Sequence, residues 1–122
     1  KQRKMKSICT MRDIYKAIST FEEEFEGVYG ISLNEAMVLC TLHDAGKPLS
    51  STEIAERTQM KTSHTSKVIR TVEEKGLIER ALGEVDKRQM FFSLTAAGGK
   101  RLEELQCDKV VIPELLKPLF VS

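Results

Sequence analysis

The pattern that most restricts how this chain can fold lies between residues 50 and 76, where two short helices joined by a tight turn are predicted. Ser50 and Glu53 have the spacing of a capping box, which predicts a helix over about residues 51–58. A second helix is predicted over residues 62–76, with a glycine at its end in the position of a left-handed cap. One side of this helix is apolar and the other is rich in Ser, Thr, His, Lys and Arg. Together the two helices form a helix-turn-helix pattern.

Two runs of strand-forming residues follow directly on this pattern. Residues 77–81 and 89–94 are joined by a polar stretch, so they predict a β-hairpin with a charged tip. Asp86, Lys87 and Arg88 lie in that tip. A helix-turn-helix followed by such a hairpin is a winged helix. The predicted fold class is therefore mainly α with a small β-hairpin wing (α+β).

A long amphipathic helix is predicted in front of the helix-turn-helix. Apolar residues recur there in steps of three and four from Ile8 to Val28, and Gly27 and Gly30 predict its end. A further helix is predicted over about residues 32–43, and its apolar residues lie around most of its circumference. We therefore expect this helix at the centre of the core.

After the hairpin, Thr95 is predicted to cap a last helix that tolerates two glycines and continues towards Ile112. Pro113 and Pro118 divide the remainder, so a short helix or turn is predicted there. The length of 122 residues fits one hydrophobic core. We therefore expect a single domain over residues 1–122.

The net charge of +1 conceals an uneven distribution along the chain. Residues 1–9 sum to +4, residues 10–60 to −5, residues 61–101 to +4 and residues 102–122 to −2. The second basic section coincides with the last helix of the helix-turn-helix and with the hairpin. No run of about 18 apolar residues occurs, so we expect neither a membrane span nor a secretory signal.

The three cysteines, Cys9, Cys40 and Cys107, lie far apart and form no Cys-x-x-Cys pair. This spacing argues against a disulfide framework and, because the chain has only two histidines, against a zinc site. We expect a reducing, cytoplasmic environment and neither a metal nor a cofactor. Cys40 lies on the inward side of the predicted helix over residues 32–43, where we expect an inert, small hydrophobic side chain.

Four stretches of the chain form a combined motif: residues 49–55 (LSSTEIA), 68–80 (VIRTVEEKGLIER), 86–88 (DKR) and 94–98 (LTAAG). These stretches resemble the MarR (multiple-antibiotic-resistance regulator) family of bacterial transcription factors. The resemblance implies a dimeric winged helix-turn-helix with flanking dimerisation helices. Residues 1–30 and 96–122 then form the dimerisation helices, and residues 31–95 form the DNA-binding lobe.

The function that the resemblance implies is sequence-specific regulation of transcription. We expect a repressor that binds a palindromic operator in double-stranded DNA as a homodimer and is released by a small ligand or an oxidant. The alternative is a winged-helix module for protein interaction without DNA binding, in which the basic side chains serve only solubility. An enzyme is not expected, because no spacing of a nucleophile, an acid–base pair or a metal cluster is present.

The candidate DNA-binding residues lie on the helix-turn-helix and on the hairpin tip. A helix fits the major groove, where short side chains reach base edges and basic side chains reach phosphates or guanine. The candidates are Ser51, Thr62, Ser63, His64, Ser66, Lys67, Arg70, Lys87 and Arg88. The alternative for the Ser/Thr cluster is helix capping alone. Thr65 is assigned to packing, because the resembled family usually places a buried aliphatic residue there.

The wing has its own candidate roles. An extended arginine such as Arg88 benefits from the concentrated negative potential of the minor groove. The resemblance implies that Asp86 orients Arg88. The alternative is an ordinary solvated hairpin tip, because charged tips are common.

Two regulatory sites are also implied by the resemblance. Phe21, Phe25 and Tyr29 are candidates to line a cleft for a small aromatic or anionic effector, and the alternative is a place in the core or an interface. Cys9 is a candidate redox switch, because some members of the family sense peroxide through a cysteine on the first helix.

Overall fold

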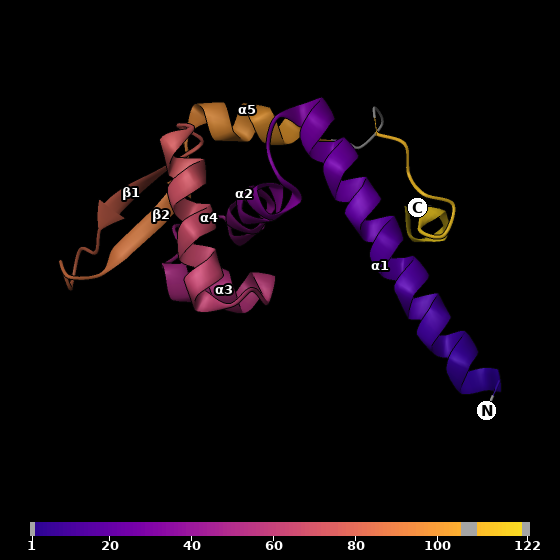
Figure 1. Cartoon of the computed structure of the whole chain (residues 1–122). Coiled ribbons are helices and arrows are strands. Elements are labelled where there is room, and N and C mark those ends of the chain that lie inside the picture. Colours follow the sequence, from indigo (N-terminus) through magenta and orange to yellow (C-terminus); the bar gives the residue numbers. More distant parts are fainter. Residues whose placement is uncertain (1, 106–109, 121–122) are drawn as a thin grey trace. The chain divides into compact units, whose positions relative to one another are not determined.

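A computed structural model describes residues 2–105 and 110–120, and the chain separates into two compact units (Figure 1). The first unit comprises Lys1–Ser32 and Cys107–Ser122, and the second comprises Leu33–Gln106. Cys107 lies outside the described residues. Among the described residues, no helix combines the length and the apolar character that a membrane span requires.

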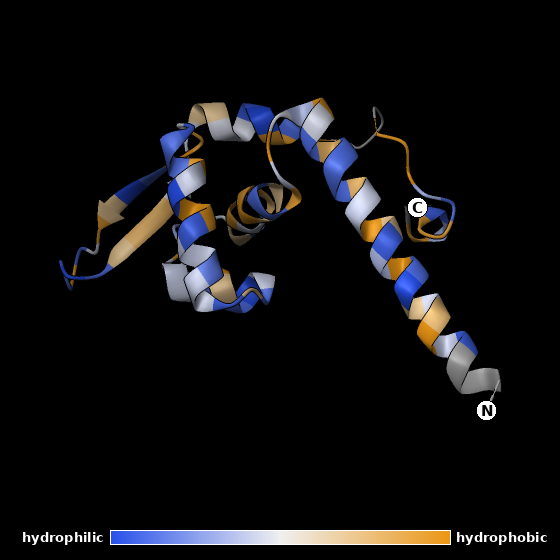
Figure 2. Cartoon of the chain, viewed as in Figure 1, coloured by the Kyte–Doolittle hydropathy of each residue, from blue (hydrophilic) through white to orange (hydrophobic). Residues whose placement is uncertain are grey.

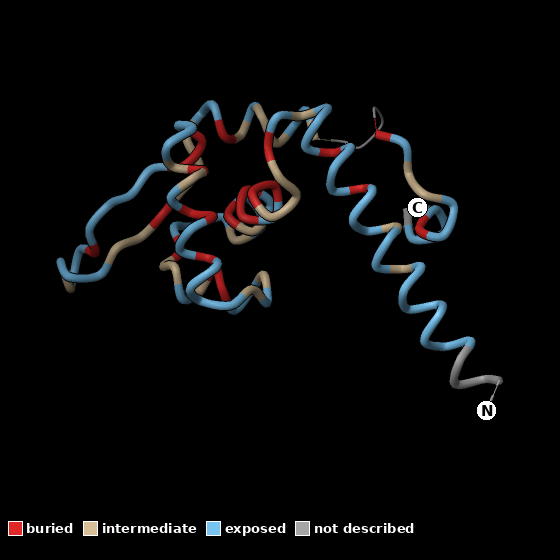
Figure 3. The backbone as a smooth tube through the Cα atoms, in the orientation of Figure 1, coloured by how far each residue is buried: buried red, intermediate tan, exposed pale blue. Residues whose placement is uncertain are grey.

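The first unit is built on helix α1 (Gln2–Tyr29), the single long helix that the apolar periodicity predicted. Gly27 lies inside this helix, and Gly30, with a φ of 74°, ends it. Phe21 and Phe25 are buried, whereas most of α1 is exposed along its length (Figure 3). Orange apolar segments recur along this exposed helix in Figure 2. Helix α1 therefore carries apolar side chains that its own unit does not cover.

The C-terminal part of the first unit contains a turn and a short helix, as its two prolines predicted. Residues 114–116 form the turn, and a 3₁₀ helix, η1 (Lys117–Phe120), follows it. The backbone N–H of Lys117 donates to the carbonyl oxygen of Pro113 at 3.1 Å. Val110 and Leu116 are buried.

The second unit contains four helices and a hairpin among its described residues. They are α2 (Leu33–Ala45), α3 (Ser51–Thr58), α4 (Thr62–Glu74), β1 (Ile78–Leu82), β2 (Met90–Leu94) and α5 (Ala96–Glu104). The predicted capping box of α3 is present: Ser50 Oγ accepts from the N–H of Glu53 at 3.2 Å, and Glu53 Oε1 accepts from the N–H of Ser50 at 3.0 Å. Gly76, with a φ of 74°, follows α4 as predicted.

Helix α2 lies at the centre of this unit, as its composition predicted, and contacts α3, α4, α5 and β2. Val38, Leu39 and Leu42 supply its buried apolar face. The predicted inward position of Cys40 is wrong, because Cys40 is exposed. At about 100° per residue, Cys40 lies just beyond the edge of the side chains that α2 buries, and its Sγ is 3.7 Å from Asp44 Oδ2.

Helix α5 ends earlier than predicted. It stops at Glu104 rather than continuing towards Ile112, and residues 110–113 are not helical. Two glycines among its nine residues lower its helix propensity. At its start, Thr95 Oγ1 accepts from the N–H of Gly98 at 3.0 Å, which confirms the predicted cap.

Strands β1 and β2 form an antiparallel hairpin that projects beyond the helices of its unit (Figure 1). In its register, Ile78 faces Leu94, and Arg80 faces Phe92. Leu49 extends the sheet by a bridge, exchanging two backbone hydrogen bonds of 2.8 and 3.0 Å with Phe92. The predicted fold class, a mainly α winged helix-turn-helix with a β-hairpin wing, is confirmed.

Candidate nucleic-acid interface

Helix α4 separates buried and exposed side chains sharply. Its buried residues are Thr65, Val68, Ile69 and Val72. Its exposed residues include six of the predicted DNA-binding residues: Thr62, Ser63, His64, Ser66, Lys67 and Arg70. Thr65 is fully buried, and its hydroxyl donates to the carbonyl oxygen of Lys61 at 2.9 Å. The interior of the unit therefore anchors one side of α4 and leaves a polar and basic side exposed.

The Ser/Thr cluster does not cap α4. The N-cap residue is Lys61, which makes no side-chain capping hydrogen bond. Ser66 lies one turn into the helix and donates its hydroxyl to the carbonyl oxygen of Thr62 at 3.1 Å. This bond occupies the hydroxyl proton of Ser66 but leaves its oxygen lone pairs available.

One contact at the start of α4 was missing from the sequence interpretation. Asn34, in the first turn of α2, places its Nδ2 at 3.0 Å from Nε2 of His64. The two residues are 30 positions apart, and no local pattern links them. Ser51, another predicted residue, is half-buried at the first position of α3.

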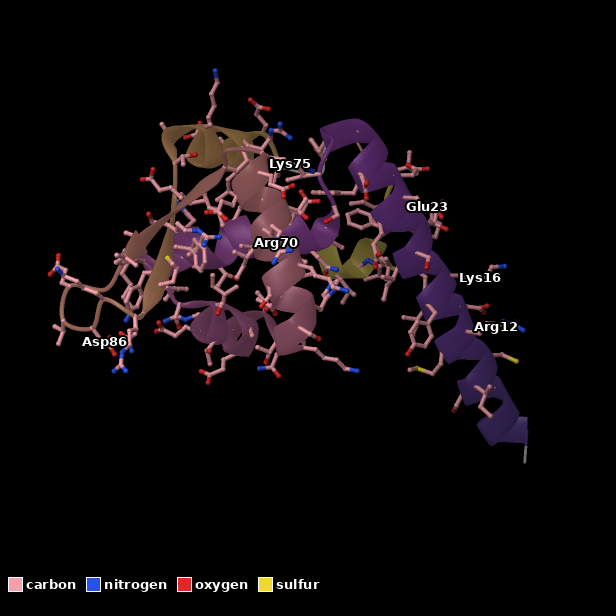
Figure 4. All side chains as sticks on the ribbon, turned by 60° about the vertical axis from the view of Figure 1, so that its left-hand side comes forward. Arg12, Lys16, Glu23, Arg70, Lys75 and Asp86 are labelled. Carbon is pink, nitrogen blue, oxygen red and sulfur yellow. The ribbon has the colours of Figure 1, made fainter. Side chains whose placement is uncertain are left out.

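At the wing, the structure pairs Asp86 with Arg88. Oδ1 of Asp86 accepts from the backbone N–H of Arg88 at 3.0 Å and from its Nε at 3.1 Å, and Oδ2 accepts from Nη2 at 3.4 Å. The hydrogen bonds from Arg88 lower the pKa of Asp86. The Arg88 side chain stays 91% exposed, and Figure 4 places Asp86 at the tip of the hairpin.

The base of the wing is joined to α4 by a second ion pair. Glu73, near the end of α4, accepts hydrogen bonds from Nε and Nη2 of Arg80 on β1. The guanidinium carbon of Arg80 lies 5.6 Å from the centre of the Phe92 ring on β2. The hydrogen bond from Arg80 lowers the pKa of Glu73. The sequence interpretation did not assign a role to this pair.

The two predicted regulatory sites differ in exposure. Phe21 and Phe25 are buried, and their ring centres lie 6.0 Å apart. The Tyr29 ring lies 4.9 Å from the Phe25 ring. This packing favours the core alternative for these residues.

Cys9 is exposed on α1, and its redox role stays a prediction. The thiol of Cys40 has a raised pKa, because of partial burial and the Asp44 carboxylate beside it.

Side chains that could bind a metal are dispersed over the described part of the chain. Among residues 2–105 and 110–120, no group of three or more His, Cys, Asp or Glu side chains is arranged to hold a metal ion.

Comparison with known proteins places this geometry in a family. Residues 31–90 match the model of the MarR family. The uncharacterised HTH-type transcriptional regulator YdcH of Bacillus subtilis (strain 168) is 37% identical over 57 residues, which are 47% of this chain and 39% of that relative. The chain spans less than half the length of the curated relatives that it matches.

Solved structures share the fold. The crystal structure of the YusO protein from Bacillus subtilis matches with a TM-score of 0.67 and 25% identity, covering 99% of this chain and 82% of that one. A cysteine-to-serine mutant of MarR from E. coli, solved with operator DNA, matches with a TM-score of 0.70 and 20% identity, covering 85% of this chain and 79% of that one. Through the winged helix of residues 31–90, the chain belongs to the MarR family.

Proposed function

We propose that the protein is a DNA-binding transcription regulator in which α4 enters the major groove and the β1–β2 hairpin enters a neighbouring minor groove. The observation that carries this proposal is the two-sided character of α4, which is anchored by buried residues and exposes a polar, basic face. A helix that is held by one face and presents such side chains on the other is suited to reading base edges.

The cations of this surface are available to phosphates. Lys61, Lys67 and Lys87 are exposed, and in the part of the chain that the structure describes none of the three has an ion-pair partner. Phosphate contacts by such side chains release counterions, so they make affinity fall steeply with salt. The protein-interaction alternative does not require this salt dependence.

The proposed roles follow from side-chain length and place. Ser51, at the start of α3, meets a phosphate. The short side chains that meet base edges are Thr62, Ser63, His64 and Ser66. Lys67 and Arg70 contact phosphates or guanine in the major groove, and Lys87 and Arg88 enter the minor groove. The E. coli MarR mutant, a protein of the same fold, was solved with operator DNA, which supports DNA as the ligand of this fold.

A homodimer is part of the proposal, because the first unit exposes more apolar surface than a monomer needs. The side chains concerned are Ile8, Met11, Tyr15, Ile18 and Val28 on α1, with Val111, Leu115 and Leu119 near the C-terminus. At about 100° per residue, the first four of these fall within about 80° on one side of α1. A second copy that covers this stripe gives a two-fold dimer and a palindromic operator.

The charges of α1 favour an antiparallel contact between the two copies. Figure 4 shows Arg12 nearest the N-terminus of the helix, Lys16 near its middle and Glu23 towards its C-terminus. The first half also contains Lys6, and residues 22–26 contain four glutamates. Antiparallel α1 helices bring unlike charges together, whereas parallel helices bring like charges together.

Selection of bound duplexes from a random pool tests this function. We expect an enriched palindromic sequence and an affinity that falls with salt as counterion release requires. An affinity for duplex DNA that is weak at low salt, with no sequence enriched, would contradict the proposal and favour the protein-interaction module. Repression and release by an effector are further proposals, tested by transcription in vitro from a promoter that contains the selected site.

A further inference from the structure

The hydrogen bond between Asn34 and His64 fixes the chemistry of a side chain in the proposed reading surface. Asn34 is half-buried on α2, His64 is exposed on α4, and Nδ2 of the amide lies 3.0 Å from Nε2 of the imidazole. Both residues belong to the second unit. The contact therefore lies within one compact body.

The identity of the two nitrogens determines where the imidazole proton lies. The amide nitrogen of asparagine can only donate, so Nε2 of His64 accepts. A neutral ring that accepts at Nε2 carries its proton on Nδ1. In the described part of the chain, Nδ1 of His64 has no hydrogen-bond partner. His64 thus has one unused polar group, an N–H donor.

We propose that Asn34 is a positioning residue for base recognition, because it holds the His64 ring in the tautomer that presents Nδ1–H to DNA. This inference rests on the proposed function of α4. A donor at this place selects acceptors in the major groove, which are N7 and O6 of guanine, N7 of adenine and O4 of thymine. It rejects the amino group of cytosine, which is itself a donor.

The packing of α2 against α4 does not depend on the hydrogen bond between Asn34 and His64. Helices α2 and α4 are already joined by their buried apolar faces and by the ion pair between Glu35 Oε2 and Lys75 Nζ at 2.7 Å. Glu35 is buried, whereas the bond to His64 is exposed to water, which competes for both partners. Removing the Asn34 side chain should therefore change fold stability little, whereas even a modest bond of this kind is enough to change the tautomer ratio of the His64 ring several-fold.

Nitrogen-15 spectroscopy of the histidine rings tests the positioning without DNA. At a pH where both rings are neutral, we expect His64 of the wild type to be protonated on Nδ1. Asn34→Asp offers only acceptors, so the proton should move to Nε2, and Asn34→Ala should release the preference. His43, exposed on α2, is the matched control and should not change. Identical His64 tautomers in all three proteins would overturn the inference.

Duplex selection tests the consequence for recognition. His64→Ala should lose discrimination at one position of each half-site by about 5- to 150-fold, and Asn34→Ala should lose part of it at the same position. The double variant should lose no more than His64→Ala alone. Affinity for random duplex should stay unchanged, because phosphate contacts remain. If the wild type selects a sequence but the two variants alter different positions, the inference fails and the proposed function stands. If the wild type selects no sequence, both fail.

Discussion

At Gly98 the backbone of α5 passes so close to Leu77 that no side chain fits. A Cβ placed there would lie 2.0 Å from the carbonyl oxygen of Leu77, an atom that also accepts from the N–H of Thr95 at 3.1 Å. Gly98→Ala should therefore destabilise the fold by about 1–3 kcal/mol, as overpacking does. Urea denaturation measures the change.

Gly99 provides the control for Gly98 in the same helix. A Cβ at Gly99 would meet nothing within 4 Å, so Gly99→Ala should leave stability unchanged or raise it by up to about 1 kcal/mol through helix propensity. Equal losses in both variants would contradict the close approach to Leu77 and indicate a general intolerance of α5 to alanine.

A second prediction at the scale of the residue concerns Asp86. Removing its negative charge near DNA should tighten binding if electrostatics alone acts, but should weaken binding if Asp86 orients Arg88. We expect Asp86→Ala to weaken binding several-fold, because three hydrogen bonds to Arg88 are lost. Fluorescence anisotropy with a selected duplex measures the affinity.

Arg88→Ala is the companion variant for the wing. It should weaken binding to most sequences and lower the slope of log affinity against log salt by about 0.9 for each lost phosphate contact. Tighter binding by Asp86→Ala, together with unchanged affinity for Arg88→Ala, would refute the wing assignment.

At the scale of the element, the ion pair between Glu73 and Arg80 holds the hairpin against α4. The pKa of Glu73 is lowered by this contact, so the pair stabilises the folded state above the unfolded pKa of the glutamate. That contribution is lost as the pH falls through the lower, folded pKa. Glu73→Gln should remove this part of the acid dependence of stability.

Hydrogen exchange reports on the same link. Backbone amides of β1 and β2 should exchange faster in Glu73→Gln than in the wild type, because the hairpin opens more often. Glu74→Gln, an exposed neighbour without an ion-pair partner in the described structure, is the control and should leave exchange unchanged. Equal exchange in both variants would show that the pair does not hold the wing.

At the scale of the whole molecule, the exposed stripe of α1 predicts a dimer at micromolar concentration. Tyr15→Glu places a charge in the stripe and should give a species of 13.8 kDa in sedimentation. Tyr15→Phe keeps the aromatic ring at the same position without a charge, so it should leave the dimer intact. A wild type that sediments only as a monomer would refute this assembly.

Charge reversal tests the antiparallel arrangement of the two copies. Reversing Lys6, Arg12 and Lys16 to glutamate brings like charges together at both ends of an antiparallel pair, so self-association should weaken. Reversing the glutamates of residues 22–24 to lysine should weaken it for the same reason. A mixture of the two variants again matches unlike charges and should associate, which is the control for folding.

A parallel arrangement predicts a different outcome for the single variants. Like charges already oppose each other in a parallel wild-type pair, and they still do so after either reversal. Each variant alone would then associate as well as the wild type. Such a result in sedimentation would contradict the antiparallel contact while leaving the dimer itself in place.

Much of the fold was predictable because its signals are local. The capping box of Ser50 and Glu53, the cap at Thr95 and the glycine after α4 each depend on residues a few positions apart. Apolar periodicity predicted α1 and the anchored face of α4 in the same way. The polar N-terminal half of α4 and the charged hairpin tip were also visible in the sequence, which is why the candidate surface could be proposed before the fold was known.

The sequence by itself therefore determined the order of the elements and most residues of the candidate surface, but not where α5 ends. Only the tertiary structure decided that Cys40 is exposed, that Glu73 reaches Arg80 and that Asn34 reaches His64. These outcomes depend on how each packed helix is rotated about its own axis, and therefore on which side chains it directs towards its neighbours. That rotation is set by contacts between residues far apart in the chain, which no local spacing encodes.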